Sequence, residues 1–144
     1  MLASFYTDKK TILKNLISFS RGSAEMKNFK DEEGFAGVYP FVPYQINLLQ
    51  KVFDKIRQTG FTGKHLAKGE RSMLNAFKES AMEYCDSNVG VLIPFHSFYN
   101  TVESFLDPII KRTIDHAKLN ELLEEHDSDI LKILFMIKHV KEIQ

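Results

Sequence analysis

Apolar residues recur at helical spacing along most of the chain. Behind Pro43, apolar side chains repeat every three or four positions, while charged and amide side chains take the opposite face. The other stripes have the same spacing and begin next to residues that favour helix starts. The predicted helix starts are Thr7 or Asp8, Pro43, Glu70, Pro94, Asp107 and Asp127. This pattern predicts an all-α fold, a compact domain of about six helices.

Glycine and proline residues divide this domain. Residues 22–42 combine glycines, Pro40 and isolated aromatic residues, which is typical of a connector, here with one short helix expected at 24–29. Residues 43–144 hold the long stripes and are predicted to form the main helical core of a single domain, 1–144. Between two of its helices, residues 91–93 are either a short strand or an extended segment.

The C-terminal segment is apolar almost all round. From Asp127 onward, apolar residues are too many for one helix face, so this helix is expected to be central to the core or to pack against a second molecule. We therefore expect Leu134, Ile137 and Val140 to be buried.

Composition narrows the class of protein without indicating an activity. Nineteen Lys and Arg residues balance nineteen Asp and Glu residues, so net charge gives no argument for a nucleic-acid or membrane partner. No apolar run reaches the length of a membrane span, and the first residues do not have the pattern of a signal peptide. The single Cys85 is expected to be a half-buried structural thiol. We therefore expect a cytoplasmic protein with no membrane partner.

One segment departs from this balance of charge. Residues 51–78 hold seven Lys or Arg residues against two acidic ones, a local excess of five. Lys64, Lys68 and Arg71 lie around a glycine-bounded loop that leads into a predicted helix, and a helix N-terminus favours an anion. The segment is a candidate phosphate site. The alternative is a solvated basic face that the acidic residues 121–129 balance.

Familiar catalytic motifs do not fit the chain. A Walker A loop needs four residues between its glycines and a Ser or Thr after its Lys, whereas Gly60 and Gly63 have two between them and His65 follows Lys64. The five histidines are scattered, so no zinc site is predicted. We expect no catalytic residue, no metal site and no cofactor in this chain.

Several uncommon strings point to a family. They are Tyr-Pro-Phe-Val-Pro-Tyr-Gln at 39–45, Gly-Lys-His-Leu at 63–66, Gly-Glu-Arg-Ser-Met-Leu at 69–74, Ile-Pro-Phe-His at 93–96 and Phe-Leu-Asp at 105–107. In these strings, and again at 131–140, the chain resembles the large P-loop ATPase of bacteriophage-exclusion (BREX) systems. The resemblance spans nearly the whole chain.

The resemblance implies that this chain is a fragment of a much larger bacterial, ATP-driven phage-defence protein. The fragment would lie downstream of the nucleotide-binding domain, because the family's Walker motifs have no counterpart here. ATP and magnesium are then expected for the parent protein and not for the fragment. The implied partners are the P-loop domain of the same polypeptide, other phage-defence components, and DNA as a candidate through the basic loop 60–71.

A remoter similarity implies a role for the fragment. Related ATPases carry a helical lid that begins with a Tyr-Pro-Phe-like string and supplies an Arg at a helix start to the nucleotide phosphates. The residues of this chain that are similar to that lid pattern are Tyr39, Pro40, Phe41 and Arg71, while Pro43, Gly69 and Glu70 are further motif residues of the family strings. The implied phosphate contacts are Arg71, Lys68 and Lys64. Two alternatives stay open. Arg71 could instead pair with Glu70 or Asp54 or face water, and the chain could be an independent nucleic-acid- or protein-binding helical module.

Overall fold

The computed structural model describes residues 1–19, 26–59, 69–138 and 140. Within these ranges the chain forms helices and loops, and it forms no β-strand. The α-helices are α1 (Leu2–Leu16), α2 (Glu32–Val38), α3 (Pro43–Thr59), α4 (Gly69–Glu83), α5 (Tyr99–Val102), α6 (Pro108–Lys118) and α7 (Glu125–Ile137), and two short 3-10 helices, η1 (Phe95–Phe98) and η2 (Glu103–Phe105), adjoin α5. The predicted all-α fold is confirmed, and residues 91–93 are extended without forming a strand.

Proline determines where two of the helices start. α3 begins at Pro43 and α6 at Pro108, since the fixed φ of proline suits a first helical residue and its missing N–H is not needed there. The Asp107 carboxylate caps α6 by accepting a hydrogen bond of 2.8 Å from the Ile109 N–H. Both predicted starts are confirmed.

The predictions for the first two helices were wrong in position. α1 begins at Leu2 and not after Thr7. Thr7 is a residue of the helix interior, and its hydroxyl donates a 3.0 Å hydrogen bond to the Ala3 carbonyl one turn earlier, so it is not a cap. Residues 26–29 are not helical, and the rest of the helix predicted at 24–29 lies outside the described residues. α2 follows instead, because Asp31 caps it by accepting a 2.7 Å hydrogen bond from the Gly34 N–H.

The helix predicted from Pro94 is divided into η1, α5 and η2. Its ends are wound more tightly, with i to i+3 hydrogen bonds such as that from the Ser97 N–H to the Pro94 carbonyl (3.2 Å), a geometry that is common at helix ends. Four residues of the predicted apolar stripe are buried nevertheless. Its buried members are Phe95, Phe98, Tyr99 and Val102.

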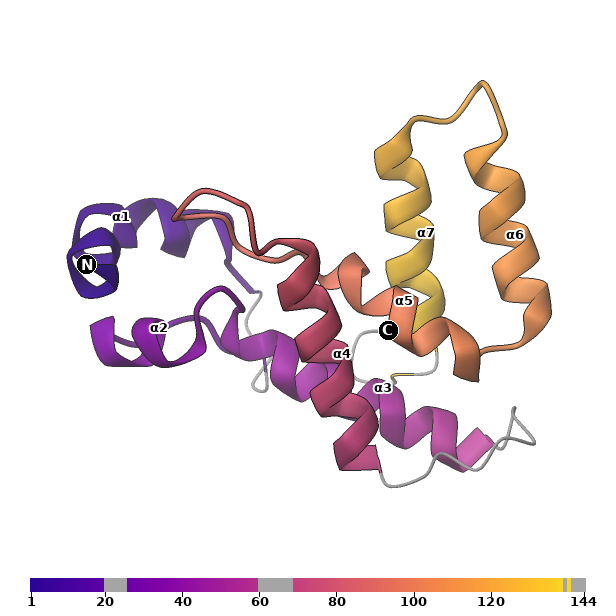
Figure 1. Ribbon diagram of the computed structural model, residues 1–144, viewed down its shortest axis with the longest axis horizontal. Helices are drawn as coiled ribbons and strands as arrows, with labels where there is room; N and C mark the ends of the chain where they lie inside the picture. The colour runs from indigo at the N-terminus through magenta and orange to yellow at the C-terminus, as the bar shows by residue number, and fades with distance from the viewer. Residues whose placement is uncertain (20–25, 60–68, 139, 141–144) are drawn as a thin grey trace.

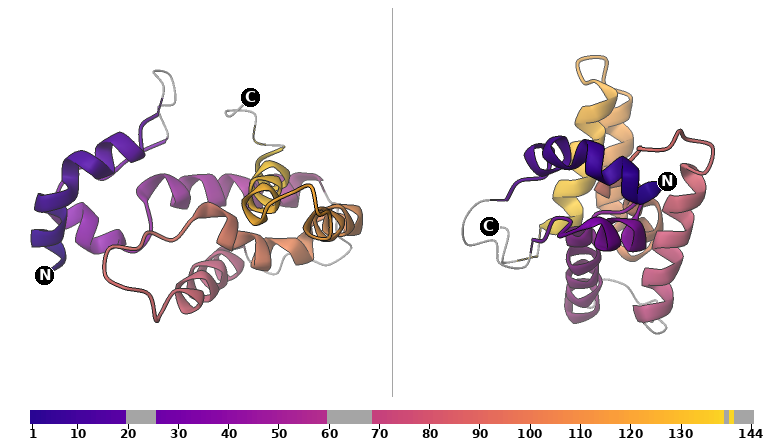
Figure 2. Two further views of the ribbon diagram at one scale, coloured as in Figure 1. Left: turned by 90° about the horizontal axis from the view of Figure 1, so that it is seen from above. Right: turned by 90° about the vertical axis from the view of Figure 1, so that its left-hand side faces the viewer.

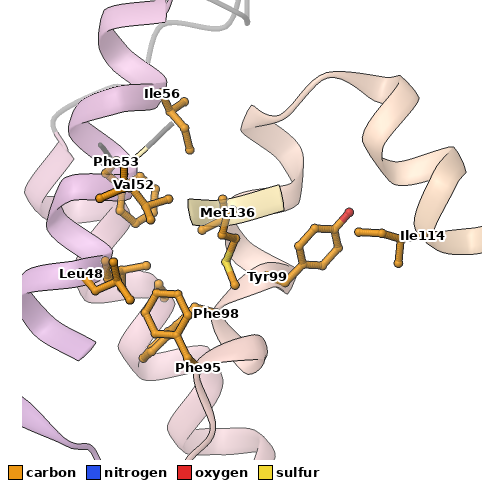
Figure 3. Packing of buried hydrophobic residues seen from close by; sticks show 13 residues of the cluster. Leu48, Val52, Phe53, Ile56, Phe95, Phe98, Tyr99, Ile114 and Met136 are labelled. Carbon is orange, nitrogen blue, oxygen red and sulfur yellow. The ribbon is translucent and has the colours of Figure 1, made fainter. Parts of the chain in front are cut away.

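The main core lies among α3, α4, the segment from η1 to η2, α6 and α7 (Figures 1 and 3). Figure 3 shows α3 side chains facing Met136 of α7 and Phe98, while Tyr99 lies against Ile114 of α6. Much of this core consists of packed phenyl rings. Phe98, for example, packs edge-to-face on Phe77 with ring centroids 5.1 Å apart.

A second, smaller core joins α1 to α2. The left view of Figure 2 shows these two helices at the end of the molecule away from α6 and α7. Phe35 of α2 is fully buried there, and its ring centroid lies 4.9 Å from that of Phe29 and 5.2 Å from that of Tyr6. Tyr44 at the start of α3 packs against both cores. The predicted connector 22–42 therefore contains a helix and part of a core where the structure describes it.

α7 is less buried than its composition predicted. It starts at Glu125, two residues before the predicted Asp127, which instead completes a capping box with Glu124. Val140 is buried as predicted and Ile137 is half-buried, but Leu134 is 53% exposed, so the prediction that Leu134 is buried within the chain is wrong. The other apolar residues of α7 from Leu131 to Ile137 lie in or against the main core, whereas Ile130 and Leu134 are exposed. None of the described helices is long and apolar enough to span a membrane.

Candidate functional site

The exposed side of α4 carries Arg71. The helix begins at Gly69, one residue before the predicted start, so Arg71 lies in its first turn. Its side chain is exposed, and its guanidinium forms no ion pair or hydrogen bond with any residue that the structure describes. Asp54, a candidate partner, pairs with Arg57 instead. The side chain of Glu70 lies outside the described part of the chain.

Arg71 lines a groove of about 550 Å³ between α4 and the segment from α5 to η2. Arg71, Asn75 and Lys78 are four and three residues apart, which puts them on one face of α4. The groove is mainly polar. Its lining consists of Arg71, Ser72, Leu74, Asn75, Lys78, Glu79, Asn100, Thr101, Ser104 and Phe105.

The one carboxylate in this lining, that of Glu79, is already hydrogen-bonded. Its Oε1 accepts a 2.7 Å hydrogen bond from the Asn75 amide, and its Oε2 accepts one from the Thr101 hydroxyl. These bonds connect α4 to α5 and orient the carboxylate. Neither Arg71 nor Lys78 forms an ion pair with it or with another described residue. The groove therefore presents two cations that are not neutralised by direct contact.

The Tyr-Pro-Phe string has structural contacts. The Tyr39 hydroxyl accepts a 2.8 Å hydrogen bond from the Gly90 N–H, and the Pro40 carbonyl accepts one of 3.0 Å from the Ile93 N–H. The Phe41 ring packs edge-to-face on Phe77 of α4, with centroids 4.9 Å apart. This string therefore fixes the α2–α3 junction against both residues 90–93 and the helix that carries Arg71.

Only part of this groove could be predicted from the sequence. Lys64 and Lys68 lie outside the described residues. Lys78 is one of the seven basic residues of 51–78, and its spacing of seven from Arg71 places both on one helix face. Asn100, Thr101 and Ser104 carry no sequence signal for the site, because only the packing of α5 against α4 brings them there.

The other chemically distinctive side chains lie elsewhere. Asp129 of α7 accepts a 2.6 Å hydrogen bond from Lys132 and lies 3.5 Å from Nδ1 of His96, a half-buried contact between α7 and η1. Cys85 is exposed, so the prediction of a half-buried thiol is wrong. It lies in the turn that follows α4. In the described parts of the chain, no three His, Cys, Asp or Glu side chains gather as metal ligands.

Comparison with known proteins adds no family to this geometry. No protein-family model matches the chain, and no solved structure matches it.

Proposed function

We propose that this chain is the helical lid of a P-loop ATPase of the bacteriophage-exclusion type. In this proposal Arg71 contacts the phosphates of a nucleotide held by a motor domain of the same polypeptide. The observation that carries the proposal is the Arg71 guanidinium, exposed in the first turn of α4 and without a partner among the described residues. The strings that resemble the family's ATPase give the nucleotide as the expected ligand.

The chemistry of the groove supports a phosphate ligand. A guanidinium stays charged at any working pH, and its planar fork donates to two phosphate oxygens at once. Lys78 supplies a second cation on the same helix face, and Asn100 supplies amide N–H groups from the opposite wall. Each carboxylate oxygen of Glu79 already accepts a hydrogen bond from within the groove, one from Asn75 and one from Thr101.

Catalysis itself would belong to the motor domain. ATP and magnesium would be bound there, and this chain would add a charge contact to the phosphoryl group as it is transferred. The chain on its own should therefore show no ATP hydrolysis above background. Hydrolysis that survives repurification of the isolated chain would contradict this division of roles.

Turnover of ATP by the intact polypeptide tests the proposal. Arg71→Ala should leave the fold intact and lower turnover by roughly one to three orders of magnitude, as expected for a lost transition-state charge contact. Arg71→Lys should restore little, since an ammonium is not a bidentate donor. Arg112→Ala is the matched control, because Arg112 is also exposed on a helix but lies on α6 outside the groove. Unchanged turnover in Arg71→Ala would reject the proposed contact.

DNA-binding measurements on the isolated chain distinguish a nucleic-acid-binding module from a lid. If the chain binds DNA by itself, the affinity should fall steeply with salt, because each neutralised phosphate releases counterions. Steep salt dependence in the isolated chain, together with unchanged turnover in Arg71→Ala, would favour that alternative over the lid.

A further inference from the structure

The turn between α6 and α7 exposes three leucines, which we call the leucine tip: Leu119, Leu122 and Leu123. They are 81%, 91% and 39% exposed. Figure 1 shows α6 and α7 as a hairpin that projects from the rest of the molecule, with this turn at its far end. Single exposed leucines are ordinary on a protein surface, but three within five residues at the end of a projecting hairpin form an apolar patch without a partner.

The backbone of the leucine tip is held in one conformation. The Asn120 side-chain oxygen accepts a 3.0 Å hydrogen bond from the Leu122 N–H, and the Asn120 carbonyl accepts another of 3.0 Å from the Leu123 N–H. The capping box then fixes the start of α7, with the Glu124 N–H donating to Asp127 at 2.9 Å. A preorganised patch loses little conformational entropy when a partner covers it.

The charge around the leucine tip is mainly negative, with exposed Lys118 at the end of α6 as the one Lys or Arg within residues 118–129. Residues 119–129 contain five acidic residues and no Lys or Arg. Asp127 and Asp129 are engaged within the hairpin, by the capping box and by Lys132. Glu121 and Glu125 are exposed and form no ion pair with any described residue. Apart from Lys118, the charged side chains next to the leucines are thus carboxylates, and those of Glu121 and Glu125 have no partner among the described residues.

We propose that the leucine tip docks on a basic amphipathic segment of a partner protein, in which apolar side chains cover the leucines and Lys or Arg side chains face the carboxylates. Charge complementarity selects this occupant, since it guides association and excludes partners of like charge. Anionic lipid headgroups and nucleic-acid phosphates would both be repelled by the carboxylates. The interaction is independent of Arg71 and of any nucleotide.

Three synthetic helical peptides test this docking against the isolated chain, followed by NMR of the backbone amides. One combines leucines on one face with lysines on the other, the second has glutamates in place of the lysines, and the third has alanines in place of the leucines. Only the first should shift the amides of residues 119–127, and raising the salt should weaken its binding, because the charges are exposed. Leu122→Ser should weaken it about tenfold, the order of affinity that one buried leucine supplies.

Leu16→Ser is the control variant, since Leu16 is also an exposed leucine, with 74% of its surface exposed, but lies at the end of α1. It should leave the peptide affinity unchanged. The proposal is overturned if the leucine–lysine peptide shifts no amide of the tip, if either other peptide binds there as tightly, or if Leu122→Ser has no effect. It is also overturned if the chain dimerises through the tip in sedimentation, because a second copy would then be the occupant.

Discussion

Gln45 connects the start of α3 to the extended residues 91–93, and its replacement by leucine should weaken the fold substantially. Its side chain is 1% exposed. The side-chain oxygen accepts a 2.9 Å hydrogen bond from the Val42 N–H, just before the helix, and the side-chain nitrogen donates a 2.7 Å hydrogen bond to the Ile93 carbonyl. Leucine has nearly the same shape but makes neither bond.

The magnitude follows from the two backbone groups that lose a partner. Val42 and Ile93 are buried, so water does not replace the lost hydrogen bonds, and each unsatisfied group costs about 1–3 kcal/mol. The added apolar surface of leucine offsets about 1 kcal/mol of that sum. We expect Gln45→Leu to lower the free energy of unfolding by about 2–4 kcal/mol.

Urea unfolding followed by circular dichroism measures this loss directly. Gln50→Leu is the matched control, the same substitution at an exposed position of α3, and it should change the free energy of unfolding by less than about 0.5 kcal/mol. The m-value should stay constant if only stability has changed. A Gln45→Leu protein as stable as the control would show that the two hydrogen bonds contribute nothing, and the reasoning would be wrong.

Other substitutions test other parts of the fold by the same assay. Gly90→Ala should cost about 1–3 kcal/mol, because Gly90 has a φ of 108° and a Cβ there would lie 2.7 Å from the Phe5 ring; an unchanged stability would contradict this. Burial, with two nearby carboxylates, raises the pKa of Tyr99 from 10.0 to about 12, so the folded protein keeps a proton that the unfolded chain releases. Stability should therefore fall as the pH rises from 10.0 to about 12, and Tyr99→Phe should reduce that fall; equal falls would refute the assignment. Leu134→Ala should change the free energy of unfolding by less than about 1 kcal/mol and Met136→Ala by about 2–5 kcal/mol, and equal losses would contradict the burial pattern of α7.

The parts of the fold that could be predicted are those that local physics decides. Apolar spacing and the prolines at 43 and 108 indicated α3 and α6 correctly, because both act within a few residues. α1 was misplaced because Thr7 is a good cap by type yet bonds back inside the helix and to Glu32 of α2. The burial of Leu134 was predicted wrongly because the number of apolar residues in a helix does not show which of them pack against other helices.

The candidate site follows the same division. Arg71 could be found because its string and its place at a helix start are visible in the sequence. The opposite wall could not be predicted, since Asn100 and Ser104 reach the groove only through the packing of a short, irregular helix against α4. Asp31 is a good N-cap by residue type and does cap α2, but the glycines around it favoured a connector at this position.

Contact between Arg71 and nucleotide is tested most directly by photo-crosslinking in the intact polypeptide. A photoreactive amino acid is placed at position 71, or at position 112 as the control, and a radiolabelled non-hydrolysable ATP analogue is added before illumination. The proposal predicts label at position 71 that unlabelled ATP removes by competition, and none at position 112. Absence of label at position 71, or equal label at both positions, would contradict the claim that this groove meets the nucleotide.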